Sequence, residues 1–166
     1  MLKSIEVDIL EDGSLDLPDQ TLRRLDLVVG AIHSHLDLPQ HKQTDRLLRA
    51  MDNRYLNILA HPTGRLINER PASAVDMERV MRGAVERSCY LELNAQPDRL
   101  DLTDAHCRLA KQLGLKVAIS TDAHATVELD FMRFGVDQAR RGWLEPQDVL
   151  NTRPVGELRT LLKQRR

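Results

Sequence analysis

The chain has 166 residues, of which 42% are hydrophobic, 30% charged and 3% aromatic, and its formal net charge is −1. This length suits one domain, and the charge balance excludes a global basic field that would hold nucleic acid nonspecifically. No apolar run approaches the roughly 20 residues of a membrane span, and the N-terminus has no signal-peptide core. Cys89 and Cys107 lack a Cys-x-x-Cys spacing, so we expect a reduced, cytoplasmic protein.

Short apolar runs alternate with amphipathic segments along the chain. The apolar runs predict five strands, over Ile5–Leu10, Leu27–Ile32, Asn57–Ala60, Tyr90–Leu93 and Val117–Ser120. The amphipathic segments predict helices over Asp19–Leu25, Gln43–Asp52, Val75–Arg87, Thr103 (as N-cap) to Leu113, Leu129–Arg141, Pro146–Leu150 and Val155–Lys163. The alternation predicts an α/β fold with a parallel sheet and outer helices. Eight such units close a TIM-like barrel, so about five strands predict a partial barrel.

Polar residues that can bind metals occur in or directly after four of these strands. Glu6 lies within the first strand, His33 and His61 follow the second and third, and Asp122 and His124 follow the fifth. The carboxyl ends of parallel strands meet at one edge of a sheet, so these side chains can converge there. Imidazole and carboxylate groups suit zinc, manganese and iron. Each residue alone is a weak signal, but their recurrence at one edge predicts a metal centre that activates water for attack on a phosphoester.

Several other polar residues leave two interpretations open. Arg65, in the turn after His61, could contact a substrate phosphate or hold its loop in a salt bridge. Asn94 and Arg99 could orient a ligand or the neighbouring loop. Strand alternation cannot decide between a buried salt bridge and a site role for Glu92.

The remaining histidines and the tryptophan are interpreted as structural or surface residues. We expect His35 to be structural or exposed, and His41 and His106 to lie on the surface. Trp143, after Gly142, is expected to pack a helix against the bottom of the barrel.

Six segments make a specific resemblance, which covers essentially the whole chain. They read I-E-V-D-I-L-E-D-G, V-V-G-A-I-H-S, I-L-A-H-P-T-G-R, L-E-L-N-A-Q-P-D-R-L-D-L, I-S-T-D-A-H and R-F-G-V-D-Q-A-R-R-G-W-L-E-P-Q-D-V-L-N-T-R-P. Together they resemble the C-terminal portion of the PHP (polymerase and histidinol phosphatase) domain found in bacterial and archaeal family X DNA polymerases. The resemblance implies a distorted (βα)7 barrel with up to three divalent ions, usually Mn²⁺ or Zn²⁺, and phosphoesterase or 3′–5′ exonuclease activity.

The same resemblance assigns a role to each candidate ligand. Glu6 matches the carboxylate that bridges the first two metals, and His33 and His61 match the histidines that complete the second site. Asp122 matches a ligand of the first metal and His124 a ligand of the third.

The family's other ligands, including its opening His-x-His motif, would lie before Met1. The resemblance therefore implies a single, N-terminally incomplete PHP domain over residues 1–166, with one fully liganded metal site and impaired hydrolysis. Its partners would be phosphoesters, including DNA 3′ ends, and not a membrane.

Two alternatives remain at this stage. The chain could be a non-catalytic metal-binding or assembly module of a larger DNA polymerase or repair protein, and an open sheet edge would then favour a homodimer. An amidohydrolase-type barrel would be expected to place a metal-ligating lysine after a middle strand, and no lysine occupies such a position.

Overall fold

The structure, a computed structural model, describes residues 1–163, and residues 164–166 of the expected domain lie outside the described part. Its elements follow the predicted order. They are β1 Ser4–Asp8, α1 Asp19–Leu22, β2 Leu27–Ala31, α2 Gln40–Asp52, β3 Ile58–Leu59, α3 Met77–Glu86, β4 Tyr90–Asn94, α4 Asp104–Gln112, β5 Val117–Ser120, the 3₁₀ helix η1 Thr126–Phe131, α5 Met132–Arg141, the 3₁₀ helices η2 Pro146–Asp148 and η3 Leu150–Thr152, and α6 Val155–Lys163.

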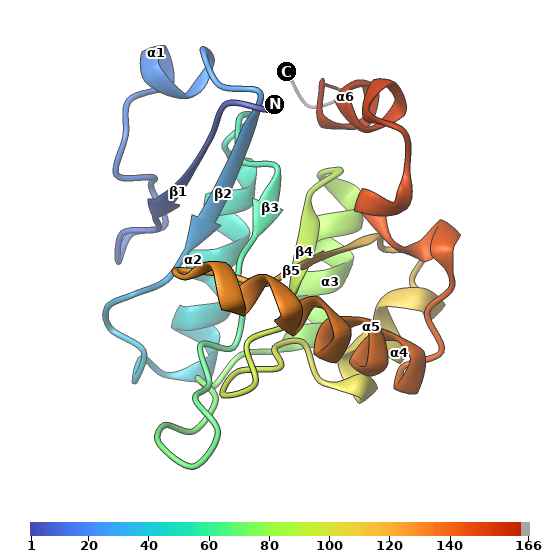
Figure 1. Cartoon of the computed structure of the whole chain (residues 1–166). Coiled ribbons are helices and arrows are strands. Elements are labelled where there is room, and N and C mark those ends of the chain that lie inside the picture. Colours follow the sequence, from blue (N-terminus) through green and yellow to red (C-terminus); the bar gives the residue numbers. More distant parts are fainter. Residues whose placement is uncertain (164–166) are drawn as a thin grey trace.

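The five strands form one parallel sheet in the order β1-β2-β3-β4-β5 (Figure 1). Each crossover contains a helix, as parallel strands require. Strands β1 and β5 are the two edges, so the sheet is open. The α/β prediction is confirmed, and the open parallel sheet is consistent with a partial PHP barrel.

Some element bounds differ from the predicted ones for local reasons. Helix α2 begins three residues early, at Gln40, because Pro39 precedes it with a φ of −53°, which suits helix entry. Strand β3 keeps only Ile58–Leu59, because the chain turns at His61. The predicted Leu129–Arg141 helix is divided between η1 and α5, and the predicted helix after Pro146 consists of 3₁₀ turns.

The larger core lies between one face of the sheet and helices α2 to α5. The sheet contributes Val28, Leu59, Leu91, Leu93 and Val117, and the helices contribute Leu47, Met51, Val80, Met81, Cys107 and Ala110. All of these side chains are fully or almost fully buried. Burial of each large apolar side chain contributes about 1.5–3 kcal/mol, so this face anchors the strands that end at the candidate site.

The opposite face of the sheet is less covered. Ile58, Tyr90 and Ala118 pack there against Leu150 and against Leu162 of α6. The prediction for Trp143 was wrong, since its side chain is 68% exposed. The backbone of Gly142 packs against Cys107 and leaves no room for a side chain, and Trp143, with a φ of 63°, turns outward.

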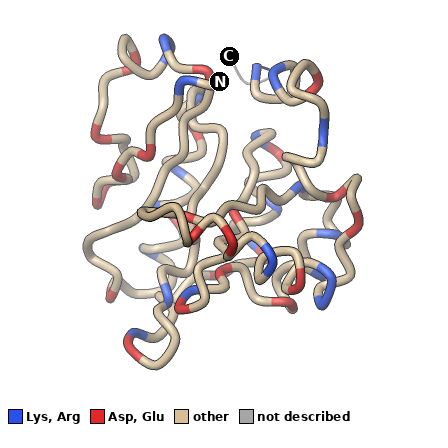
Figure 2. Tube along the Cα trace, viewed as in Figure 1, with Lys and Arg blue, Asp and Glu red and all other residues tan. Residues whose placement is uncertain are grey.

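Charged side chains of both signs are interspersed along the chain (Figure 2). None of the helices in residues 1–163 has the length and apolar character needed to cross a membrane.

Candidate metal centre

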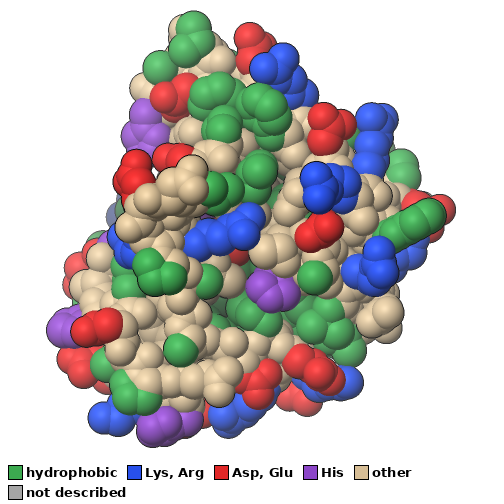
Figure 3. Space-filling model, turned by 90° about the horizontal axis from the view of Figure 1, so that it is seen from below, with side chains coloured by type: hydrophobic (Ala, Val, Ile, Leu, Met, Phe, Trp, Pro, Cys, Tyr) green, Lys and Arg blue, Asp and Glu red, His purple; other side chains and the backbone are tan. Residues whose placement is uncertain are grey.

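Strand register aligns the acidic residues of β1 with His33. In the β1–β2 pair, Glu6 is opposite Val29 and Asp8 is opposite Ala31. Alternate residues of a strand share a face, so Glu6 and Asp8 lie on the same face of the sheet, and His33 comes two residues after Ala31. Strands β1 and β2 run toward the side of the molecule shown in Figure 3, where histidine side chains reach the surface among acidic and basic groups.

Glu6, His33 and His61 form a compact cluster. One ligand atom from each lies within 4.8 Å of the others. His33 Nε2 is 3.3 Å and His61 Nε2 is 3.6 Å from Glu6 Oε1, and the two imidazole ring centres are 5.4 Å apart. The structure thus brings together the three residues that the sequence assigns to one metal site.

The backbone at His61 explains how this residue reaches the cluster. Alternation along β3 would turn its side chain toward the larger core, on the side of Leu59. His61 instead has a φ of 24°, which turns the side chain out of the strand pattern. Its N–H donates to Glu92 Oε2 at 2.7 Å, and Gly64 N–H donates to the carbonyl of His61 at 2.8 Å. The tight turn therefore holds a side chain that is only 3% exposed.

Electrostatics in the cluster favour a bound cation. The hydrogen-bonding contact with His61 lowers the pKa of Glu6, although partial burial opposes this. Burial alone would lower the pKa of His61, but Glu6 and Glu92 raise it overall. One carboxylate and two imidazoles at this spacing suit a divalent ion, so the donor set fits the expected metal.

Glu92 supports the cluster from inside the protein. Its side chain is buried, and its carboxylate accepts hydrogen bonds from the backbone of His61, from Asn94 Nδ2 at 3.3 Å and from Ser120 Oγ. Burial raises the pKa of this carboxyl. Within residues 1–163 these contacts are hydrogen bonds and not a buried salt bridge, so the salt-bridge interpretation of Glu92 is not supported there.

Asp122 and His124 lie beside the three-residue cluster and are not part of it. Asp122 Oδ2 accepts a hydrogen bond from Asn94 Nδ2 at 3.1 Å and lies 3.7 Å from Arg99 Nε. His124 is exposed, and its Nδ1 lies 2.8 Å from the carbonyl of Asp122. Glu6 and Asp122 both line one cavity of about 350 Å³ on the less covered face of the sheet.

The three residues expected to contact substrate have protein partners here. Arg65 donates from Nε to the carbonyl of Arg99 at 2.6 Å and from Nη2 to that of Leu100 at 2.5 Å. It therefore holds its loop through carbonyls and not through a salt bridge. Asn94 links Glu92 to Asp122, and Arg99 lies beside Asp122, 20% exposed.

Sequence reasoning missed two buried residues that build the site. Arg46 is fully buried and donates to the carbonyls of Ile9, Leu10 and Ser34, in the loops after β1 and β2. Its position beside Leu47, on the apolar face of α2, could have indicated that Arg46 is buried. Asp101 is also fully buried and accepts from the backbone and hydroxyl of Thr63, two residues after His61.

Sequence reasoning also missed Asp8, which contacts His33. Its position two residues after Glu6 in the same strand could have indicated that both carboxylates lie on one face of the sheet. Among the other histidines, His35 is exposed, as expected, and its Nε2 lies 3.9 Å from Glu11. His41 is exposed, as predicted. His106 is half-buried, and its Nδ1 is buried.

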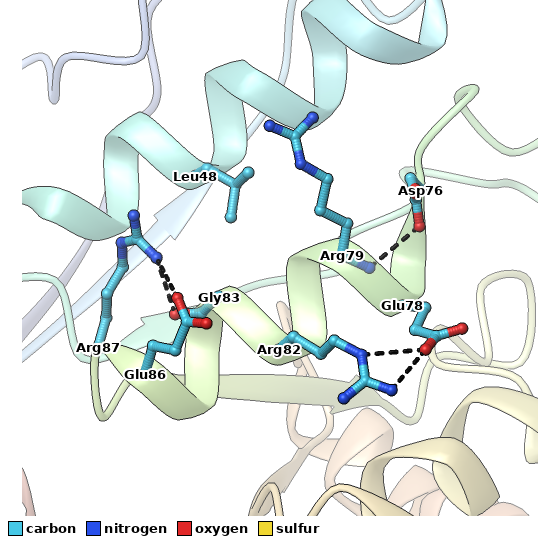
Figure 4. Close-up of a pocket in the computed structure, with 8 residues that line it drawn as sticks. All are labelled: Leu48, Asp76, Glu78, Arg79, Arg82, Gly83, Glu86 and Arg87. Atoms are coloured by element: carbon cyan, nitrogen blue, oxygen red, sulfur yellow. Dashed lines mark hydrogen bonds and ion pairs between the residues drawn. The ribbon is translucent and has the colours of Figure 1, made fainter.

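A larger hollow of about 530 Å³ lies elsewhere, between α2 and α3 (Figure 4). Its three arginines have acidic partners, with Arg79 at 2.9 Å from Asp45, Arg82 at 2.7 Å from Glu78, and Arg87 at 2.7 Å from Asp52. This hollow is therefore a salt-bridged surface, and the strand ends remain the candidate site.

Comparisons with known proteins show what the chain is similar to. No family model matches the chain. The chain is homologous to probable phosphatases of the PHP class and to a family X polymerase, and these matches are consistent with a portion of a PHP domain.

In three relatives the similarity extends over essentially the whole chain. DNA polymerase/3'-5' exonuclease PolX of Bacillus subtilis (strain 168) is 42% identical over 164 residues, which are 99% of this chain and 29% of that protein. Probable phosphatase Teth514_1060 of Thermoanaerobacter sp. (strain X514) is 28% identical over 176 residues, covering 100% of this chain and 69% of the relative. Probable phosphatase TTE1963 of Caldanaerobacter subterraneus subsp. tengcongensis is 29% identical over 180 residues, covering 100% and 66%. The chain thus spans less than a third of PolX and about two thirds of the phosphatases.

Proposed function

We propose that this chain is the metal-binding part of a PHP-type phosphoesterase that acts on phosphoesters, including DNA 3′ ends. The observation that supports this most is the Glu6–His33–His61 cluster at the strand ends of a chain homologous to PolX. A divalent ion in such a site, Mn²⁺ or Zn²⁺, supplies Lewis acidity and activates water for attack on phosphorus.

The protein's own side chains would hold the ion and orient the substrate. Glu6, His33 and His61 would hold the ion, and Asp122 and His124 would contribute to neighbouring sites. Arg99, which lies beside the cavity-lining Asp122, would contact a phosphate oxygen, since its guanidinium donates in a fixed planar geometry. Arg65 and Asn94 would keep the surrounding loops in place for substrate.

We further propose that residues 1–166 belong to one PHP domain and hydrolyse phosphodiesters slowly on their own, because residues 1–163 contain one compact set of candidate ligands. Metal content should be measured by elemental analysis of chelator-free protein, for the wild type and for Glu6→Ala and His61→Ala. About one ion per chain, lost in both variants, supports the single-site proposal. Two or three ions per chain would mean that other groups complete further sites, and would contradict it.

Turnover distinguishes the enzyme from the alternative, a non-catalytic module of a larger repair protein. Hydrolysis of bis(p-nitrophenyl) phosphate with Mn²⁺, abolished by His61→Ala, would support the hydrolase. A chain that binds one ion and shows no turnover at any metal concentration would favour the metal-binding module.

Two further proposals concern assembly and location. The exposed edge of β1 favours pairing with a second copy, and a monomeric sedimentation profile at micromolar concentration would refute a homodimer. The lack of a Cys-x-x-Cys spacing between the two cysteines supports a cytoplasmic location, which fractionation of the source cells would test.

A further inference from the structure

We propose that Asp8 is a positioning residue for His33, which fixes the protonation and ring orientation of that histidine toward the metal site. This inference depends on the proposed function, because it assigns a role within the same site. Its basis is one contact that the proposed ligand set does not use: His33 Nδ1 lies 2.5 Å from Asp8 Oδ1. On the other side of the ring, His33 Nε2 lies 3.3 Å from Glu6 Oε1.

The chemistry of the ring makes this contact directional. A neutral imidazole carries its proton on one nitrogen and a lone pair on the other, and an ionised carboxylate can only accept. Asp8 therefore selects the form of His33 with the proton on Nδ1. The lone pair of Nε2 then faces the Glu6–His61 cluster, where a metal would bind. Histidine ligands in metalloproteins are oriented by such carboxylate partners.

The local sequence produces this arrangement without any long loop. In I-E-V-D, Glu6 and Asp8 are two residues apart on β1 and share a face, and the parallel register sets Asp8 beside Ala31, two residues before His33. One strand thus supplies the carboxylate for each nitrogen of one imidazole.

His33 needs such a partner more than His61 does. The side chain of His61 is 3% exposed and is held by its packing, whereas the side chain of His33 is 46% exposed and Asp8 is 53% exposed. An exposed pair of this kind contributes little to the stability of the fold. Loss of Asp8 should therefore change metal affinity much more than stability.

The test compares Asp8→Ala and Asp8→Asn with Asp137→Ala, a control that removes an exposed carboxylate on α5. The affinity for Zn²⁺ is measured by competition with a fluorescent chelator. Removal of a carboxylate that orients a metal ligand typically costs about 10–100-fold in affinity, and we expect this loss for Asp8→Ala. Asp8→Asn should keep most of the affinity, because its amide oxygen can accept the same proton, and Asp137→Ala should bind as the wild type does.

A second readout uses the metal-free protein. Long-range ¹H–¹⁵N NMR spectra of the imidazoles should show a proton on Nδ1 of His33 in the wild type and in Asp8→Asn, and a smaller population of molecules with this proton in Asp8→Ala. A wild-type His33 protonated on Nε2 alone would overturn the proposal. Zn²⁺ affinity of Asp8→Ala equal to that of Asp137→Ala would overturn it too, and so would equal losses in both Asp8 variants, which would indicate a charge effect.

Failure of the proposed function has a different signature. If the wild type binds no Zn²⁺, the metal site and the metal role of Asp8 are both removed, whatever the tautomer. If the wild type binds Zn²⁺ and Asp8→Ala binds it equally well, only the inference about Asp8 falls.

Discussion

Arg46 is the residue whose replacement tests the construction of the site most directly. Its side chain is fully buried, and its guanidinium donates to the carbonyls of Ile9 at 2.5 Å, Leu10 at 2.8 Å and Ser34 at 2.9 Å. Ile9 and Leu10 follow the strand that contains Glu6, and Ser34 follows His33. One side chain of α2 therefore joins the two loops that set the geometry of the metal cluster.

The stability that Arg46→Met should lose follows from the number of carbonyls that it leaves without a hydrogen-bond donor. Arg46→Met keeps the apolar stem and much of the volume, so the main loss is the three hydrogen bonds. The carbonyl of Leu10 keeps the N–H of Gly13 as a donor, so the carbonyls of Ile9 and Ser34 are the two that lose their partner. Loss of the partner of such a group costs about 1–3 kcal/mol, so two of them give a loss of about 2–6 kcal/mol. This is a large part of the roughly 5–15 kcal/mol by which domains are stable.

Urea unfolding followed by circular dichroism measures this loss, with Arg49→Met as the control on the same helix. Arg49 is exposed, and within residues 1–163 its guanidinium donates to the carbonyl of Asp45, so its replacement should change the free energy of unfolding by less than about 0.5 kcal/mol. If Arg46→Met destabilises the chain by no more than about 1 kcal/mol relative to Arg49→Met, the reasoning on Arg46 is refuted.

Three further predictions concern the interior. Gly135→Ala would place a methyl 2.6 Å from Ile119 Cγ2 and 2.8 Å from Ala95 Cβ, so it should lower the free energy of unfolding by about 1–3 kcal/mol in a urea titration, and a neutral effect would contradict this. Burial raises the pKa of Cys107 to about 12, so iodoacetamide at pH 8 should leave this thiol unmodified in the folded chain, and rapid alkylation would show the burial to be wrong. Burial also raises the pKa of the Asp101 carboxyl, so the folded state binds this proton more tightly than the unfolded state. The resulting stabilisation is complete below about pH 4 and is lost as the pH rises through the folded pKa. Asp101→Asn should flatten the pH dependence of the unfolding free energy above about pH 4, and an unchanged slope would argue against it.

Matched controls make these three results specific. A Cβ at Gly156 meets no atom within 4 Å, so Gly156→Ala should not destabilise the chain. Cys107 should react once guanidinium unfolds the protein. Asp130 is exposed, and Asp130→Asn should leave the pH dependence as it is in the wild type.

Local sequence patterns were enough to predict much of the fold. Val117–Ser120 and Val155–Lys163 have the predicted bounds, and Thr103 caps α4 by accepting from the N–H of His106 at 3.2 Å, as its place before the helix indicated. These features depend on apolar period and on side-chain bonds to the nearby backbone, which short segments determine. The parallel direction of the strands followed for the same reason, because each crossover carries its own helical pattern.

The sequence alone also determined which residues could converge, since Glu6, His33 and His61 each occur in or after a strand of one parallel sheet. Only the tertiary structure decided how they meet. The positive φ of His61 reverses the side that alternation assigns to it, and the register of β1 with β2 puts Asp8 against His33. Arg46, Glu92 and Asp101 form bonds to backbone groups that lie between 31 and 38 residues away. Contacts of this kind depend on how distant segments pack and not on the period or propensity of any one segment, so a single sequence does not show them.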